Sequence, residues 1–241
     1  KSDLGYYAQA NKYQTIPSQV VSNALSNVAY PIISSLNNDP EKQVQYLRKL
    51  TKTTAFLIFP IMLGLMGIAE NVIQILLTAK WLPSVPYFKV LVGAAIFSPF
   101  QVLFLNTFNA VGRPNYNFGL EMVRNSLVIL SLVCFHQTIM QMLYAFVVAQ
   151  ALSYLLDIIV LGRFVKYTLI QHFKDIMAYA IISLIMYILV VITGNLVDNI
   201  YLSATIQIVV GIATYLLLTS LFGQNIMKEA KELIVKKDKV N

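Results

Sequence analysis

Amide side chains recur on one face of the first apolar stretch of this sequence. Gln19, Asn23 and Asn27 follow one another at four-residue spacing, which places them on one side of an α-helix. Carboxamides both donate and accept hydrogen bonds, so such a row suits a hydrated cavity for a polar substrate such as a sugar. The same row also suits hydrogen bonds between neighbouring helices, and the sequence leaves both interpretations open.

Further polar side chains lie within later apolar stretches. Asn106 and Asn109 follow Ser98 and Gln101 in a broad helical arc, and the two asparagines are additional candidate cavity residues. Asp157 is interpreted as structural, because small residues at four-residue spacing in the same stretch favour close helix packing.

Two charged side chains inside apolar stretches are candidate functional groups, because charge is costly in lipid. Glu70 is a candidate proton- or cation-coupling carboxylate, and the alternative is a group that reaches the membrane interface. Arg124 follows Glu121 at three-residue spacing, which favours an internal ion pair. Alternatively, Arg124 contacts a diphosphate, for which its planar fork of donors is well suited.

No motif in the sequence is typical of an enzyme. It has no phosphate-cradling glycine loop, no HExxH pair and no nucleophile with an adjacent base. His136 and His172 are predicted at opposite faces of the membrane, so they cannot share a metal ion. We therefore expect no catalysis, no metal and no cofactor, and the sequence favours transport or scaffolding.

Seven long apolar stretches are the elements that must position these side chains. Each has about the 20 residues that a helix needs to cross a ~30 Å hydrocarbon core, and a backbone in lipid must be helical. The sequence therefore predicts an all-α, polytopic transmembrane bundle. Its spans are Ile16–Leu36, Thr54–Leu77, Tyr87–Asn109, Asn117–Phe135, Ile139–Gly162, Ile176–Gly194 and Tyr201–Phe222.

Prolines and one acidic residue predict where these helices start and bend. Pro17 is expected to open the first span, as proline is tolerated in a first helical turn. Asp39 is the expected N-cap of a helix that begins at Pro40. Pro60 and Pro99 interrupt the second and third spans.

Basic residues between the spans alternate between the two sides of the membrane. One side carries thirteen lysines and arginines and the other carries three. Since basic residues mark the cytoplasmic face, the N-terminus is predicted outside and the C-terminus in the cytoplasm. Within this single transmembrane domain, residues 1–15 are then an outside segment, residues 16–222 hold the spans, and residues 223–241 form a basic amphipathic tail.

Composition argues against other classes of protein. The chain is 57% hydrophobic and 12% charged, whereas a typical soluble domain is roughly 25% charged. The net charge of +7 lies in the inside loops and the tail, where it meets anionic headgroups, so no nucleic-acid partner is expected. Cys134 is the single cysteine, which excludes an intrachain disulfide.

The start of the chain suggests a missing segment. Lys1 is followed by no signal peptide, yet a predicted outside N-terminus needs an earlier span to carry it there. We therefore expect this chain to be the C-terminal part of a longer transporter. The alternative is a complete seven-span protein with an exported N-terminus.

Short motifs between Leu4 and Asn117 form a recognisable set. They are Leu4-Gly5-Tyr6-Tyr7, Ala10-Asn11-Lys12, Ile16-Pro17-Ser18-Gln19, Tyr30-Pro31-Ile32, Phe59-Pro60, Lys80-Trp81-Leu82-Pro83 and Asn109-Ala110-Val111-Gly112-Arg113-Pro114. Together they resemble the start of the second half of bacterial polysaccharide flippases, the Wzx-like members of the multidrug/oligosaccharidyl-lipid/polysaccharide exporter superfamily. Beyond Asn117 the resemblance rests mainly on span spacing.

The resemblance implies two helix bundles around a central cavity, with this chain as most of the second bundle. It implies alternating-access movement of undecaprenyl-diphosphate-linked repeat units across the bacterial inner membrane, for O-antigen, capsule or exopolysaccharide. The implied partners are the bilayer, the lipid-linked glycan, the missing N-terminal half and the polysaccharide polymerase machinery. Some relatives place cationic cavity residues in the helix that matches Ile16–Leu36, which lacks Arg and Lys here, so diphosphate recognition is expected to rest largely on other residues.

Other functions remain open at this point. A cation-coupled drug exporter of the same superfamily needs a carboxylate that faces a more apolar, aromatic cavity, whereas rows of Asn and Ser favour a glycan. A membrane polymerase or acyltransferase needs clustered charged or His residues in a large outside loop, and the outside loops after Thr15 are short. In a non-transporting scaffold the polar rows would be purely structural.

Overall fold

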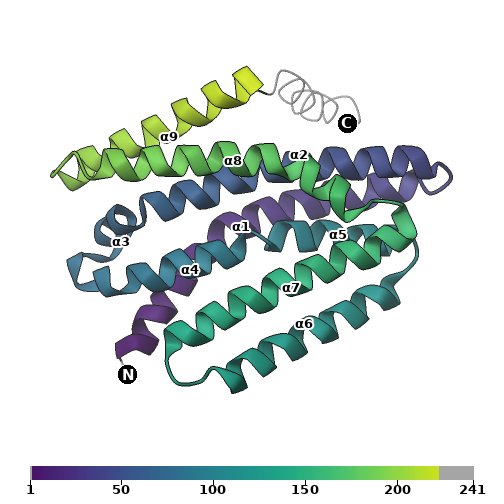
Figure 1. Cartoon of the computed structure of the whole chain (residues 1–241), viewed down its shortest axis with the longest axis horizontal. Coiled ribbons are helices and arrows are strands. Elements are labelled where there is room, and N and C mark those ends of the chain that lie inside the picture. Colours follow the sequence, from purple (N-terminus) through teal and green to yellow (C-terminus); the bar gives the residue numbers. More distant parts are fainter. Residues whose placement is uncertain (1, 223–241) are drawn as a thin grey trace.

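The protein is an all-helical bundle in the computed structural model, which describes residues 2–222 (Figure 1). The helices are α1 (Ser2–Ser35), α2 (Pro40–Gly67), α3 (Ala69–Leu77), the 3-10 helix η1 (Ala79–Ser84), α4 (Val85–Ala95), α5 (Ser98–Ala110), α6 (Pro114–Cys134), α7 (Ile139–Val165), α8 (Leu169–Gly194) and α9 (Ile200–Phe222). The predicted all-α, polytopic class is confirmed. The predicted tail at residues 223–241 lies outside the described residues.

Six segments of the described part are long and apolar enough to cross a membrane, by length and composition. They are Pro40–Gly67, Ala79–Ala110, Pro114–Cys134, Ile139–Val165, Leu169–Gly194 and Ile200–Leu221. Helix α1, which contains the first predicted span, is long enough but does not reach the same apolarity, because its amides and serines interrupt the apolar run.

The start of α1 differs from the prediction. The helix begins at Ser2 rather than near Ile16, and Pro17 lies within it. The polar and aromatic residues before Pro17 are helical because they pack on the neighbouring η1 and α4. Ala10 is fully buried, and the Tyr6 ring meets the Trp81 ring edge-on with centroids 5.9 Å apart. Tertiary packing thus outweighs the loss of one backbone donor at an internal proline.

The other helix boundaries largely follow the capping residue and the prolines seen in the sequence. Asp39 caps α2 as predicted, because its side chain accepts a hydrogen bond from the backbone N–H of Lys42 at 3.2 Å. Helix α2 continues through Pro60 and ends at Gly67, so the second predicted span is divided between α2 and α3. The third is divided between α4 and α5, immediately before Pro99.

The turns of the bundle gather at its two ends (Figure 1). The α3–α4 connection, the α6–α7 turn and the α8–α9 turn lie at the end where the chain begins. The α1–α2, α5–α6 and α7–α8 connections lie at the opposite end. This arrangement matches the alternation predicted from the basic residues, while the orientation in the membrane stays a prediction.

The core consists of aromatic and aliphatic side chains between α1, α2, α4, α5 and α7. Phe88, Phe100, Phe104 and Phe108 are almost completely buried there. Helices α8 and α9 pack together, and α8 lies along α2 (Figure 1). Helix α6 packs on α7 and α5 and has no buried residue, so its outer side is free to contact lipid or further protein.

A cluster of amides ties the first turns of α9 to α3 and α8. The side-chain N–H of Asn71 donates to the Gln207 amide oxygen at 2.6 Å and to the Ser203 hydroxyl at 3.1 Å. The Gln207 amide in turn donates to the Val190 carbonyl at 2.9 Å. Polar bonds of this kind hold helices together in lipid, where apolar contact alone adds little.

The sharp connection between α7 and α8 leads to a stability prediction. A Cβ added at Gly162 would lie 2.8 Å from the Tyr167 carbonyl oxygen, so the backbone must shift. We expect Gly162→Ala to lower the free energy of unfolding by about 1–3 kcal/mol, the usual range for overpacking. The thermal unfolding midpoint of the full-length protein in detergent measures this change.

Gly119→Ala is the matched control, because no atom lies within 4 Å of its added Cβ. Alanine is the better helix former, so this control should unfold at the wild-type temperature or slightly above. Equal unfolding midpoints for the two variants would contradict the close approach at Gly162.

Candidate functional site

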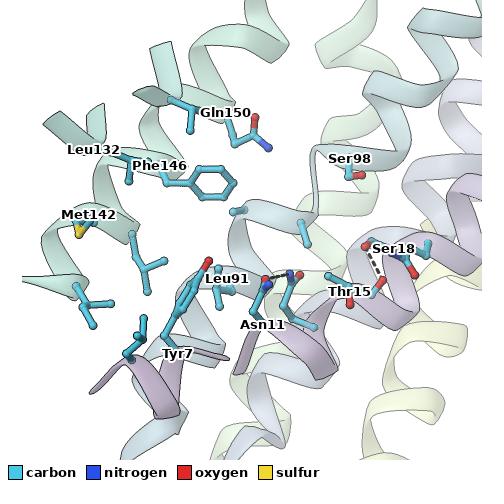
Figure 2. A pocket seen from close by; sticks show the side chains of 18 residues that line it. Tyr7, Asn11, Thr15, Ser18, Leu91, Ser98, Leu132, Met142, Phe146 and Gln150 are labelled. Atoms are coloured by element: carbon cyan, nitrogen blue, oxygen red, sulfur yellow. Dashed lines mark hydrogen bonds between the residues drawn. The ribbon is translucent and has the colours of Figure 1, made fainter. Parts of the chain in front are cut away.

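A cavity of about 520 Å³ opens between α1, α4, α6 and α7 (Figure 2). Helix α1 contributes a polar wall, whereas the opposite walls are mainly apolar. Figure 2 shows the side chains of Tyr7, Phe146 and Gln150 pointing into this space. Its labelled lining residues are Tyr7, Asn11, Thr15, Ser18, Leu91, Ser98, Leu132, Met142, Phe146 and Gln150.

The polar wall has unused hydrogen-bonding capacity. Gln14 donates to the side-chain oxygen of Asn11 at 3.0 Å, while its own amide oxygen is buried with no partner among residues 2–222. The amide oxygen of Gln150, on the opposite helix, is also buried without a partner in the described part. Small rotations of these side chains would present acceptors to a ligand rich in hydroxyl groups.

The predicted amide row lies beside this cavity on the same helix. Gln19 lines the cavity margin, and Gln19, Asn23 and Asn27 are all exposed. None of the three side chains forms a hydrogen bond within the described residues 2–222. The predicted single face is therefore present, and hydrogen bonds to helices of the described part do not account for it.

The two asparagines of α5 are placed differently. Asn106 is buried against α1, where it donates to its own helix at Val102 at 2.9 Å and to the Ser26 hydroxyl at 3.4 Å. Asn109 is half-buried near the end of α5. The geometry of Asn106 is that of helix packing, and sequence spacing could not distinguish this role from cavity lining.

A second cavity, of about 420 Å³, lies between α5, α6 and α7 and is more polar. Arg124 lines it and contacts Glu121 at 3.2 Å, which is the internal ion pair that the spacing favours. Buried Asp157 lies in the same wall, together with Gln101. Arg124 therefore faces two carboxyl groups, which compete with any phosphate for its donors.

Glu70 is not a buried carboxylate. It lies in the first turn of α3, is 69% exposed, and pairs with Lys89 of α4 at 3.2 Å. Its position matches the interface alternative more closely than an internal coupling site. In the described residues, no group of three His, Cys, Asp or Glu side chains comes close enough to hold a metal ion.

Sequence reasoning missed the cavity residues before Pro17. Asn11 and Thr15 lie in the cavity wall, but residues 1–15 were predicted to be a segment outside the membrane. The sequence does contain a pattern that predicts a polar helical face here, because Asn11, Thr15 and Ser18 follow helical spacing and lead into Gln19.

The fold defines the chain as a multi-pass helical protein, with six segments among residues 2–222 able to cross a membrane and polar cavity walls between its helices. Residues 1–86 match a family described as polysaccharide biosynthesis protein. The succinoglycan biosynthesis transport protein ExoT of Rhizobium meliloti (strain 1021) is 31% identical over 124 residues, which cover 51% of this chain and 25% of ExoT. The teichuronic acid biosynthesis protein TuaB of Bacillus subtilis (strain 168) is 23% identical over 212 residues, 87% of this chain and 44% of TuaB.

A solved structure supports the same fold. The lipid II flippase MurJ, in an inward closed conformation, superposes with a TM-score of 0.77 and 22% sequence identity, over 94% of this chain and 48% of MurJ. The sequence matches agree with the resemblance to Wzx-like flippases, and the superposition confirms the fold that this resemblance implies. The chain spans less than half the length of each of these three proteins.

Proposed function

We propose that this chain forms the second half of a flippase that moves lipid-linked oligosaccharides across the inner membrane. One observation carries the proposal, namely the exposed row of Gln19, Asn23 and Asn27 beside the polar wall of the α1 cavity. Three exposed amides are costly against lipid, so this face requires water, substrate or further protein. A glycan satisfies such amides through its hydroxyl groups.

The names of the similar proteins support the same substrate class. Two are described as polysaccharide transport or biosynthesis proteins, and the third as a flippase of lipid II. We infer an undecaprenyl-diphosphate-linked glycan as the substrate and the N-terminal half of the same protein as the other wall of the cavity. The polysaccharide polymerase machinery would receive the product, and we expect no catalysis by this chain.

The site residues take unequal parts in this proposal. Gln19, Asn23 and Asn27 contact the glycan, and Asn109 extends the polar surface toward the end of α5. Asn106 holds α5 to α1 and supports the row from behind. Contact between Arg124 and the diphosphate requires that Glu121 release the guanidinium.

A cation-coupled drug exporter of the same superfamily is less well supported. That function needs a carboxylate facing an apolar, aromatic cavity, whereas Glu70 is exposed and paired with Lys89. The carboxyl groups of Glu121 and Asp157 face a polar cavity that contains Arg124.

Complementation tests the proposed function. The full-length reading frame is expressed in a flippase-deficient strain that makes the lipid-linked repeat unit, and surface polysaccharide is quantified. We expect restored surface polysaccharide, with an empty vector as the control. A stably inserted protein that restores no polysaccharide with any tested repeat unit, yet exports cationic drugs, would favour the exporter function.

A further inference from the structure

A buried polar network joins α2, α7 and α8 at the α7–α8 connection. It consists of Arg48, Tyr154, Tyr167, His172 and Asp175, which we call the corner network. Tyr167 and His172 have no exposed surface, and Tyr154 and Asp175 are each 4% exposed. The proposed function assigns no role to any of these residues, although several of them can bind or release a proton.

The backbone of the connection places Tyr167 inside the bundle. Lys166 has a left-handed conformation with φ of 51°, which turns the chain sharply after α7. The absence of a side chain at Gly162 leaves room for the Tyr167 carbonyl. As a result, a residue from a short connection reaches the core between α7 and α8.

Hydrogen-bond donors in the network all point toward Asp175. Arg48 holds both oxygens of the Asp175 carboxylate, with Nε and Nη2 each at 2.8 Å. An ionised carboxylate only accepts hydrogen bonds, so the Tyr167 hydroxyl donates to Oδ2 at 3.1 Å. Burial also raises the pKa of Tyr167, which keeps the phenol protonated.

The same logic fixes the tautomer of His172. The single Tyr167 proton is directed at Asp175, so the Tyr167 oxygen accepts from Nδ1–H of His172 at 3.2 Å. Nε2 then carries a lone pair and accepts the hydroxyl proton of Tyr154. The result is an ordered chain that runs from Tyr154 through His172 and Tyr167 to Asp175.

The residues around this hydrogen-bonded chain offer few other hydrogen-bond partners to its members. Helix α5 presents the rings of Phe100 and Phe104, whose centroids lie 5.9 Å and 5.6 Å from that of His172. From α2, the charged side chain of Arg48 contacts the hydrogen-bonded chain at Asp175. From α7, Tyr154 faces His172 directly, and Asp157 follows one turn later on the same helix.

Each end of the corner network approaches a polar region. The Arg48 side chain is 39% exposed and connects Asp175 with the protein surface. At the other end, the Tyr154 ring stacks on Phe104 at 5.9 Å, and Phe104 lines the polar cavity that contains Asp157, Glu121 and Arg124. One aromatic layer therefore separates Tyr154 from that cavity.

We propose that the corner network is a proton relay that carries a proton from the polar cavity to Asp175 and couples proton uptake to transport. When the Phe104 ring moves aside, a proton from cavity water adds to the Tyr154 oxygen as the Tyr154 proton passes to Nε2 of His172. The Nδ1 proton passes to the Tyr167 oxygen, and the Tyr167 proton passes to Oδ2 of Asp175. One proton leaves the cavity, one neutral carboxyl group forms, and the reverse sequence resets the chain.

Protonation of Asp175 acts directly on the helix arrangement. A neutral carboxyl group lacks the negative charge that attracts Arg48, so the bond between α2 and α8 weakens. Helix α8 packs on α2 and on α9, so a weaker bond at Asp175 loosens one of its two main contacts. The coupling role rests on the proposed function, whereas the hydrogen-bonded chain does not.

Transport in inside-out membrane vesicles tests the coupling. The vesicles come from a host that makes the lipid-linked repeat unit, lacks its own flippase and carries the full-length protein. The measured quantity is the ratio of glycan translocation rates with and without an imposed pH gradient. We expect a ratio of several-fold for the wild type and a ratio near one for Tyr167→Phe, which cuts the chain between His172 and Asp175.

Tyr46→Phe is the matched control, since its buried hydroxyl has no hydrogen-bond partner in the described part. It should keep the wild-type ratio. A wild-type ratio of one, or a wild-type ratio in Tyr167→Phe, overturns the coupling. A wild type that moves no glycan under any gradient refutes the proposed function and the coupling together.

The hydrogen-bonded chain has a separate test that needs no substrate. Nitrogen-15 histidine spectra of the full-length protein report the tautomer of His172, whose signal is identified by its loss in His172→Gln. We expect the Nδ1–H tautomer in the wild type and a changed signal in Tyr167→Phe. The Nε2–H tautomer in the wild type overturns the relay whatever the vesicles show.

Discussion

Joint replacement of Asn23 and Asn27 by leucine is expected to reduce polysaccharide export strongly in the full-length protein. Both amides are exposed on α1 and form no hydrogen bond within residues 2–222, so their loss leaves the described packing intact. Two hydrogen bonds to a glycan are together worth about 1–3 kcal/mol, which corresponds to roughly 5- to 150-fold in rate or affinity. Surface polysaccharide in the complemented flippase-deficient strain, at equal membrane abundance, measures the effect.

A second double variant controls for the chemical change. Asn38→Leu with Gln45→Leu also replaces two exposed amides by leucine, but at positions away from the row. We expect this control to export at the wild-type level. Full export by Asn23→Leu/Asn27→Leu would instead favour a structural role for the row, such as a contact with the other half of the transporter.

Among substitutions that remove a partly exposed charged side chain, Arg48→Ala is expected to destabilise the protein the most. It leaves the Asp175 carboxylate, with 3% of its side chain exposed, without the guanidinium that holds both oxygens. Removal of one partner from a buried pair costs about 3–5 kcal/mol, and water that reaches the exposed part of the Arg48 site favours the lower end of that range. The thermal unfolding midpoint in detergent is the measurement.

Lys42→Ala provides the comparison, because its ion pair with Asp39 is exposed at both ends. Such surface pairs add little to stability, so this variant should unfold near the wild-type temperature. The double variant Arg48→Met/Asp175→Leu removes both charges and should be less destabilised than Arg48→Ala. Equal midpoints for Arg48→Ala and Lys42→Ala would contradict a structural bond between α2 and α8.

The sequence predicted the helices well because membrane spans depend on local composition. The start of α1 could not be predicted this way, since Ala10 and Tyr6 are held in a helix by η1 and α4 rather than by their own apolarity. Proline signals were ambiguous for a related reason. Pro17 and Pro60 lie inside helices, whereas Pro99 follows a break.

The candidate site shows the same division between local and distant information. Helical spacing identified the face that holds Gln19, Asn23 and Asn27, and its role in transport stays a prediction. Spacing could not show that Asn106 packs against α1 or that Glu70 pairs with Lys89. Arg48 was counted only as a marker of the cytoplasmic side, because Asp175 lies 127 positions further along the chain.

The long separation between Arg48 and Asp175 also has a consequence for biosynthesis. Helix α8 packs on α2, yet five α-helices and η1 are synthesised between them. During that interval the side of α2 that carries Gly67 and Phe56 lacks its contacts with α8, and Arg48 lacks the Asp175 carboxylate. Membrane helices insert first and associate afterwards, so closure of the α2–α8 contact belongs to the last stage of assembly. A nascent chain stalled before residue 169 would therefore lack the α2–α8 contact altogether.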